Sequence, residues 1–589
     1  MATSKHYEAG EWLVEATKSY RELIIDEGAV LKAPEDKGLT LSVNGVGTQL
    51  RPGTYRGDVV LTVHDYFKMP PSGLFRKLDK PVDFRAALVI KDGKIIEAQG
   101  VPSMLQGGSI TPNEINGVTI YDNEESFNGI IIDGDSEVTI ENVTLDFEGA
   151  GGNDFMGVGA GITTIGNSKV HIRNCDLMFA CITRCDIHAG GNSEVWIDDC
   201  RMVNCSPATD RMEPAWMLGL RGTNRALQLC DNAIVHYNNC YLRGNGWGVF
   251  SIDGVIKNRM YVSNSTIDLI GPRARGYGAF AIGDSIITYD HCKVFVNGYP
   301  ILMNTEEGGG AEYLNGTEIT GPLYGALIFR DNNGHFYVKD SSMDTGRSSF
   351  VVKGSNTNIH LERSVIKAGN GVILQLMDND DVGHGTYFKP PIGKIDVYEE
   401  GRDLTAAVFE KDVFMDITDM EVEGDFLNSS TNLRANDDTE HIAHFAIGLK
   451  GEGLTDTLVE SREAHPDEEE EVVEDDLQGA KNLELKLVRA TVKGVISSAL
   501  QRYYDGVTVI DSSNSEELSN VIQTPAPTVN NGVIVLLDAG SKWIVTGTSY
   551  ITKLVIEEGA QVVANSMTVD GASVAIAPGA YVGRIVLNG

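Results

Sequence analysis

A short phrase recurs along the chain at a spacing close to 25 residues. NSKVHIRNCDL at 167–177 is followed by NSEVWIDDCRM at 192–202, and related phrases continue to NIHLERSVI at 358–366. Each phrase is an alternating apolar strand, a polar pair and one small residue. The small residues are Val143, Cys175, Cys200, Cys240, Ser265, Cys292, Gly316, Ser341 and Ser364. A phrase that returns at a fixed period predicts a repeat architecture rather than a row of globular domains.

The length of the period indicates which repeat this is. The spacings between successive small residues are 32, 25, 40, 25, 27, 24, 25 and 23 residues. Three short strands and three turns fill such an interval, as one coil of a β-solenoid requires. An antiparallel sandwich also uses short strands but has no reason to keep this phase. We therefore expect an all-β chain, a right-handed parallel β-helix in which the longer intervals are turn insertions.

The two ends of the chain contain a second repeat. NGVGTQLRPGTYRGDVVL at 44–61 aligns without a gap to DGASVAIAPGAYVGRIVL at 570–587. Two related β modules therefore bracket the solenoid, either as caps over open strand edges or as contacts through which the chain forms a homo-oligomer. We expect four regions: an N-terminal β cap module at 1–120, a β-helix core at 121–377, an irregular acidic insertion at 378–480, and C-terminal coils with a cap module at 481–589.

The charge of the chain excludes several classes of partner. Asp and Glu number 83 against 48 Lys and Arg, which gives a net charge of −35. Nucleic acids and anionic membranes require clustered positive charge, so neither is expected as a partner. The start MATSKHYEAG has no apolar leader core, which favours a cytoplasmic protein, although a chain whose leader had been removed would read the same way. The run HPDEEEEVVEDD at 465–476 reads as a solvated loop; a metal site would need ligands at fixed spacing.

All eight cysteines fall between 175 and 292. Four of them share the repeated position with Val, Ser and Gly, which indicates that this position selects a small volume. We expect reduced, buried thiols stacked along the solenoid. A disulfide between neighbouring coils is the geometric alternative. A zinc site would need four converging ligands, and we expect no metal.

The longest interval between small residues, from Cys200 to Cys240, holds SPATDRMEPAWMLGLRGTNRALQL at 206–229. Arginine forks suit carboxylates and phosphates, and aromatic side chains in the next two coils could stack on a ring. We expect a cleft on an outer face of the solenoid; the alternative is that glycines punctuate turns and the aromatics cap the core. The candidate catalytic residues are Asp210, Arg211, Arg225, Asp253, Tyr277 and His384. The candidate substrate-binding residues are Trp216, Arg221, Asn224, Trp247, Arg330 and Asp381.

These residue types suit proton transfer next to a carboxylate. In β-elimination or epimerisation the Arg cluster would bind the carboxylate, while Tyr277 or Asp253 would exchange the proton. MDNDDVGHGTY at 377–387 resembles pectin-degrading polygalacturonases in GHG and an Asp pair, which implies glycoside hydrolysis. In that family the pair and the histidine lie about a coil apart, whereas here they are almost contiguous, and turn formation explains the stretch as well. No phosphate or dinucleotide loop is present, and we expect no cofactor.

The chain as a whole resembles bacterial right-handed parallel β-helix repeat proteins of the pectate-lyase-like superfold. The resemblance lies in phrases such as AWMLGLRGTNRALQL, GWGVFSIDG and GVILQLMDNDD, and it extends from about residue 120 to the end. It implies the fold and no particular reaction. Our main hypothesis is an intracellular, cofactor-independent lyase, isomerase or hydrolase for a small cyclic polar substrate such as a sugar acid, oligosaccharide, plant polyphenol or glycoside. The alternative is a structural or adhesive solenoid without catalysis.

Overall fold

The computed structural model describes the chain in two compact units. Described residues up to Asp268 belong to unit 1, those from Leu269 onward belong to unit 2, and each unit is treated by itself. The described residues are 4–73, 80–153, 155–205, 224–245, 248–252, 257–270, 276–304, 310–328, 334–354, 357–377, 380, 413–430, 481–506, 517–527 and 532–589.

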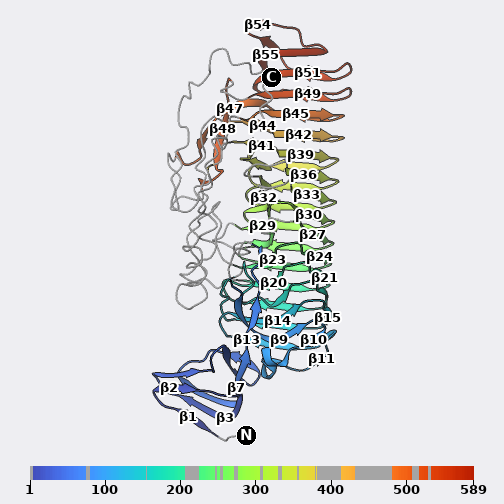
Figure 1. Cartoon of the computed structure of the whole chain (residues 1–589). Helices are drawn as coiled ribbons and strands as arrows, with labels where there is room; N and C mark the ends of the chain where they lie inside the picture. The colour runs from blue at the N-terminus through green and yellow to red at the C-terminus, as the bar shows by residue number, and fades with distance from the viewer. Residues whose placement is uncertain are drawn as a thin grey trace. The chain divides into compact units, whose positions relative to one another are not determined.

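Unit 1 is built from coils of three strands, one in each of three sheets (Figure 1). The first sheet contains β12 (Glu114–Asn116), β15 (Glu137–Glu141), β18 (Lys169–Arg173), β21 (Glu194–Asp198), β24 (Ile234–Asn238) and β27 (Asn258–Ser263). The second sheet contains β13 (Thr119–Asp122), β16 (Thr144–Phe147), β19 (Asp176–Phe179), β22 (Arg201–Asn204), β25 (Tyr241–Gly244) and β28 (Thr266–Leu269). The third sheet contains β9 (Val82–Lys91), β14 (Phe127–Asp133), β17 (Ile162–Thr164), β20 (Cys185–Ala189), β23 (Arg225–Leu229) and β26 (Gly248–Ile252).

Unit 2 repeats the same three-sheet coil. Its first sheet contains β30 (Ser285–Asp290), β33 (Ala311–Asn315), β36 (Gly334–Lys339), β39 (Thr357–Glu362), β42 (Val413–Thr418), β45 (Leu483–Val488), β49 (Val533–Leu537) and β51 (Thr548–Ile556). Strands at the second position of the coil are β31 (Lys293–Val296), β34 (Glu318–Gly321), β37 (Ser342–Thr345), β40 (Val365–Ala368), β43 (Glu421–Glu423), β46 (Thr491–Lys493), β50 (Lys542–Ile544) and β52 (Gln561–Val563). The third sheet contains β29 (Tyr277–Ile282), β32 (Tyr299–Asn304), β35 (Ala326–Ile328), β38 (Phe350–Val352), β41 (Val372–Leu376), β44 (Asp425–Asn428), β47 (Ile496–Tyr503) and β48 (Val521–Pro525).

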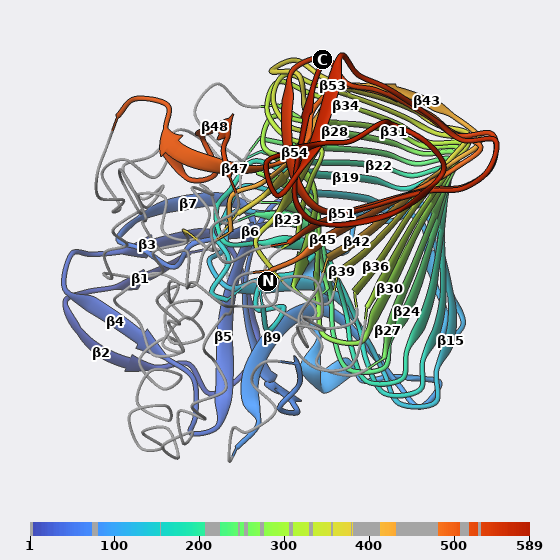
Figure 2. The same ribbon diagram turned by 90° about the horizontal axis from the view of Figure 1, so that it is seen from above.

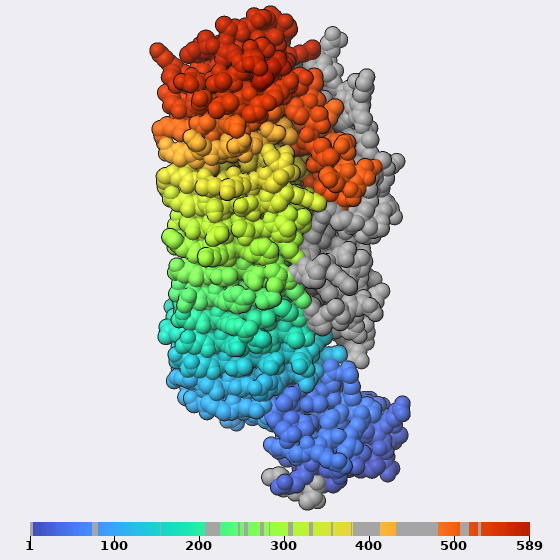
Figure 3. Space-filling model, turned by 180° about the vertical axis from the view of Figure 1, so that it is seen from behind, coloured from blue at the N-terminus to red at the C-terminus, as the bar shows by residue number. Residues whose placement is uncertain are grey.

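Strands of successive coils pair in parallel, so equivalent residues lie above one another. His171 of β18 pairs with Trp196 of β21, and Trp196 pairs with His236 of β24. Seen from above, β15, β24 and β27 follow one another along the stack (Figure 2), and the coils of each unit form successive colour bands in the space-filling view (Figure 3). The predicted right-handed parallel β-helix is confirmed. The described residues contain no α-helix, and none of their helices is long and apolar enough to cross a membrane.

A regular coil also lies inside the range that we expected to be irregular. Strands β42, β43 and β44 follow each other between Val413 and Asn428. Strand β42 pairs with β39 and β45, and β44 pairs with β41 and β47. The period was missed here because many residues separate this coil from its neighbours along the sequence. The acidic run at 465–476 lies outside the described residues.

The repeated small residue follows a tight turn between the first and second sheets. The residue before it adopts positive φ in coil after coil, as at Asn174, Asp199 and Asn239, with φ of 50°, 55° and 54°. Asn, Asp and Gly tolerate this left-handed conformation best. In one coil Gly316 occupies the turn at φ 55°, so the small residue there is Thr317 and not Gly316 as we predicted.

In most coils the small residue also supplies a polar side-chain atom, which its volume alone did not predict. The backbone N–H of Cys175 donates to Cys200 Sγ at 3.4 Å, and that of Cys240 donates to Ser265 Oγ at 3.0 Å. In unit 2, Thr317 N–H donates to Ser341 Oγ at 3.0 Å. Cysteine, serine and threonine therefore form a ladder of hydrogen bonds along the stack. All eight cysteines are free thiols.

This ladder predicts different outcomes for two substitutions of equal bulk. Cys200→Thr retains an acceptor for Cys175 N–H, whereas Cys200→Val buries that N–H without a partner. We expect Cys200→Val to lower the free energy of unfolding by about 1–3 kcal/mol relative to Cys200→Thr. Urea denaturation of the two variants measures this difference. Equal stabilities would show that the position selects volume alone.

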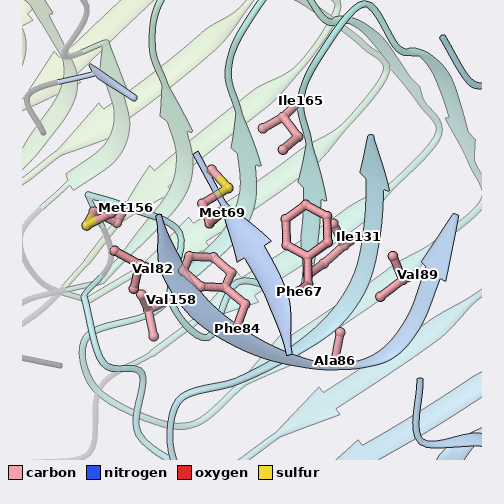
Figure 4. Close-up of a cluster of buried hydrophobic side chains, with 10 residues drawn as sticks. All are labelled: Phe67, Met69, Val82, Phe84, Ala86, Val89, Ile131, Met156, Val158 and Ile165. Carbon is pink, nitrogen blue, oxygen red and sulfur yellow. The ribbon is translucent and has the colours of Figure 1, made fainter. Parts of the chain in front are cut away.

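The third sheet differs from the other two because both of its faces are buried. In unit 1 every residue of β14, β17, β20, β23 and β26 is buried. Near its start, Ile131 of β14 and Val89 of β9 pack against an apolar cluster on the outer face (Figure 4). The cluster includes Phe67 and Met69 from β8 (Phe67–Met69), together with Met156 and Val158. A covered outer face is the place in this fold where a site can exclude water.

Candidate functional site

The outer face of the third sheet changes from apolar to polar along unit 1. The inward column Ile130, Ile162, Ile187, Leu227, Phe250 is apolar, and Phe250 contacts Tyr237 of the first sheet across the interior, with ring centroids 5.2 Å apart. Because side chains alternate along a strand, the next column faces outward. That column reads Ile131, Thr163, His188, Gln228, Ser251. Four successive coils therefore have a polar side chain at this outward position, whereas the coil before them has Ile131.

Arg225 extends this polar column at the start of β23. It is 1% exposed, and its Nη1 donates to Gln228 Oε1 at 2.7 Å. Its guanidinium lies over the ring of Phe155, 4.0 Å from the centroid, an arrangement that favours the cation electrostatically. Asn128 joins from β14, where its Nδ2 donates to Thr163 Oγ1 at 3.1 Å. We call these residues the outer-face patch: Asn128, Thr163, His188, Arg225, Gln228 and Ser251.

His188 is the titratable base of the patch. It is fully buried, and burial lowers the pKa of its imidazole to about 4, while the nearby Asp231 carboxylate acts in the opposite direction. The imidazole is therefore neutral at pH 7. Its Nε2 lies 3.7 Å from the thiol of Cys230, which follows β23. A neutral imidazole beside a thiol can accept and return a proton.

The turn at residues 155–160 covers the patch from outside, through the backbone of two glycines and one aromatic ring. Asn128 Nδ2 donates to Gly157 O at 2.7 Å, and Gly159 N–H donates to Asn128 Oδ1 at 2.9 Å. A Cβ at Gly157, where φ is 74°, would lie 2.5 Å from His188 Cγ, so only glycine fits over the imidazole. Phe155 of the same turn stacks on Arg225. The turn thus closes the patch from outside while its backbone satisfies Asn128.

The corner that leads into the third sheet is held by a second buried cation, Arg184. Its guanidinium donates to the carbonyls of Gly149, Phe127 and Gly159 at 2.5–2.7 Å. It also pairs with Asp122 at 3.0 Å, both side chains being fully buried. These bonds join successive turns of unit 1, so Arg184 explains the rigidity of the corner and not the chemistry of the patch.

Asn224 belongs to this corner and not to the patch. Its Nδ2 donates to Cys181 O at 2.5 Å and to Asn204 Oδ1 at 2.6 Å. Asn204 in turn donates to Asp186 Oδ1 at 2.7 Å, and burial raises the pKa of the Asp186 carboxyl well above its ordinary value. Both amide atoms of Asn224 are thus hydrogen-bonded inside the fold, which indicates a positioning role. Its predicted contact with substrate stays a prediction.

Tyr277, the third candidate that the structure describes, lies in unit 2. It begins β29, is fully buried and packs edge-on against Phe280, with centroids 5.5 Å apart. Its predicted role in proton exchange stays a prediction. The outward column of this unit is apolar through Phe280, Leu302, Leu327 and Val351. The remaining predicted site residues lie outside the described residues, namely Asp210, Arg211, Asp253, His384, Trp216, Arg221, Trp247, Arg330 and Asp381.

One acid of the Asp380–His384 stretch is described. Asp380 is fully buried in unit 2 and forms an ion pair with Lys353, which is also fully buried. It accepts hydrogen bonds from Tyr503 OH at 3.0 Å and Ser519 N–H at 2.8 Å. Partners from within the fold therefore account for this carboxylate. Within the described part of the chain, no three His, Cys, Asp or Glu side chains form a group that could hold a metal ion.

Arg225 was among the candidates predicted from the sequence, whereas the residues around it were not. His188 and Gln228 stand in the stretches CDIHA and RALQL, which are third-sheet strands outside the repeated phrase. The available signal was a polar residue between apolar ones in a strand buried on both faces. Comparisons with protein-family models, with curated proteins and with solved structures gave no match. The candidate site therefore rests on its own geometry.

The pKa of His188 predicts a pH-dependent contribution to stability. An imidazole whose pKa is lowered from 6.5 to about 4 binds fewer protons in the folded state between these two values. Folding is then favoured as pH rises through this window. We expect the stability of wild type relative to His188→Gln to increase from pH 4 to pH 6.5 and to change little above it. Denaturation at several pH values tests this, and a difference independent of pH would contradict a buried neutral imidazole.

Proposed function

We propose that unit 1 carries an acid–base catalytic site at the outer-face patch, with a lyase or epimerase reaction on a small cyclic substrate that bears a carboxylate, such as a sugar acid. The observation that carries the proposal is a water-excluded column in which a neutral imidazole and a guanidinium occur within one polar patch. Uncompensated burial of polar groups costs stability, and perturbed titratable groups gather where chemistry requires them.

Each residue of the patch has a role in this proposal. Arg225 binds the substrate carboxylate through its planar fork. His188 removes the proton alpha to that carboxylate, and the guanidinium stabilises the enolate that forms. In an elimination the electron pair then expels the oxygen substituent at the beta carbon. In an epimerisation His188 returns the proton to the opposite face after the enolate has turned over in the site, because Cys230 lies on the same side as His188, 3.7 Å from its Nε2.

The position of the residues supports this division of roles. Gln228 pairs with His188 in the neighbouring strand and accepts the Arg225 hydrogen bond. Gln228 therefore links the two groups, because it lies beside His188 in register and is bonded to Arg225. Phe155 covers Arg225 and Gly157 covers His188, so substrate entry requires displacement of residues 155–160.

A second candidate function is a structural or adhesive solenoid. The observation in its favour is the duplicated module at the two ends of the chain, which is described in the next subsection. The two functions are compatible, since one concerns an outer sheet face of unit 1 and the other concerns sheet edges.

The enzyme proposal predicts selective loss of turnover. Wild-type protein is incubated with uronate oligomers, plant glycosides and phenolics, and products are followed by mass spectrometry and by absorbance of unsaturated uronates. We expect turnover of a uronate, reduced about 10²–10⁴-fold in His188→Gln and in Arg225→Ala, because each removes a group that acts in the transition state.

The matched control is Arg201→Ala, which removes a 49% exposed arginine of unit 1 whose contacts among the described residues are Asp176 and Met178, both outside the patch. Its activity should equal that of wild type. Rates in Arg225→Ala or His188→Gln that match the control would contradict the assignment of the patch. Absence of turnover by wild type in every substrate class would favour the structural alternative.

A further inference from the structure

The modules at the two ends of the chain are structural duplicates. The N-terminal module comprises β1 (Lys5–Tyr7), β2 (Gly10–Leu13), β3 (Lys18–Ile25), β4 (Ala29–Lys32), β5 (Lys37–Val43), β6 (Val46–Thr48) and β7 (Gly53–Asp65). The C-terminal module comprises β49, β50, β51 and β52, followed by β53 (Ser566–Val569), β54 (Ala572–Ser573) and β55 (Gly579–Asn588). The central antiparallel pair has the same register in both, since Leu23 faces Tyr55 and Leu554 faces Tyr581.

Local details repeat as well. Tyr55 OH donates to Arg51 O at 2.7 Å, and Tyr581 OH donates to Ala577 O at 2.8 Å. In the C-terminal module, Asp570 adopts φ 50° and accepts the N–H of Arg584 at 3.0 Å. Its N-terminal counterpart Asn44 has φ 51° and accepts the N–H of Asp58 at 2.9 Å. An edge that pairs with a strand in one module is therefore expected to be able to pair with a strand in the other module.

One edge of the C-terminal module is bonded to a coil of the β-helix. Strand β49 pairs with β45, and β50 pairs with β46, both in parallel. Asp538 N–H donates to Leu487 O at 3.1 Å. Trp543 of β50 is fully buried, and its Nε1 donates to Gly494 O at 3.0 Å.

The same edge of the N-terminal module is open. Among the described residues, β1 pairs only with β3 and β2 pairs only with β4. Trp12 stands where Trp543 stands in the duplicate, but it is 37% exposed and its Nε1 bonds locally to Glu8 O at 2.7 Å. Leu13 is 60% exposed beside it. This edge presents unpaired backbone and apolar side chains.

At the opposite edge the N-terminal module is bonded and the C-terminal module is open among the described residues. Strand β6 of the N-terminal module pairs in parallel with β13, and Asn123 N–H donates to Gly47 O at 2.9 Å. Its counterpart β54 pairs only with β53 among the described strands. Each module is thus bonded along one edge and open along the other, and the open edges are opposite ones.

We propose that copies of this chain assemble head to tail, with the open β1 edge of one copy pairing with the open β54 edge of the next. The counterpart of the β1 edge is bonded to strands in the C-terminal module, and the counterpart of the β54 edge is bonded to a strand in the N-terminal module. A second copy of the chain supplies a partner for each open edge. A contact between two different surfaces leaves one of each free, so assembly continues to chains larger than a dimer. This inference is independent of the outer-face patch.

Two proline variants separate the edges. Asp26 N–H donates to Tyr7 O, so the backbone N–H of Glu8 faces the open edge, and Glu8→Pro removes this donor. Val574 N–H donates to Met567 O, so the backbone groups of the preceding residue, Ser573, face away from β53. Ser573→Pro therefore removes a donor from the open β54 edge. We expect wild type to form concentration-dependent species beyond the dimer in sedimentation velocity, and each variant alone to be monomeric.

Mixing the two variants gives the decisive result. Each keeps the edge that the other lacks, so an equimolar mixture should form one-to-one dimers and nothing larger. Leu13→Lys, which changes an exposed side chain, provides a second variant of the β1 edge, and circular dichroism checks that all variants fold. Wild type that stays monomeric or stops at a closed dimer would overturn the proposal. A mixture of folded variants that stays monomeric would overturn it too.

Discussion

Parallel pairing between successive coils is the constraint on which the rest of this structure depends. It fixes register, and register places equivalent side chains in columns. The ladder that includes Cys175, Cys200 and Ser341 follows from it, because a small polar side chain can then accept the N–H of its equivalent one coil away. The outer-face patch follows from the same register, since Thr163, His188 and Gln228 meet only because three separate strands align.

The patch conflicts with the stability of the fold around it. Burying an arginine, a histidine and two amides on a sheet face is less favourable than burying the isoleucine that precedes them. Phe155 offsets part of this cost by stacking on Arg225, and the backbone of Gly157 and Gly159 satisfies Asn128. In unit 2 the outward column is apolar from Phe280 to Val351 and continues with the buried polar residue Gln375. What distinguishes unit 1 is that its polar residues include an imidazole and a guanidinium.

Much of the fold could be predicted from the sequence, and much of the candidate site could not. The phrase around Cys175 and Cys200 repeats because the first two strands and their tight turn are nearly the same in every coil. The duplicated ends were equally visible. Third-sheet strands do not alternate in polarity, because both of their faces are buried, so His188 and Gln228 had no periodic signal. Arg225 was predicted from a local excess of arginine, but its neighbours depend on register and on a covering turn that no local pattern encodes.

The central claim is that the outer-face patch receives a carboxylate, and histidine-selective NMR with added galacturonate tests it most directly. The His188 resonance, assigned by its absence in His188→Gln, should move on titration with galacturonate at pH 7 and stay in place with glucose, which lacks the carboxylate. The shift should disappear in Arg225→Ala. A His188 signal that is indifferent to galacturonate, or that responds equally to glucose, would contradict the account.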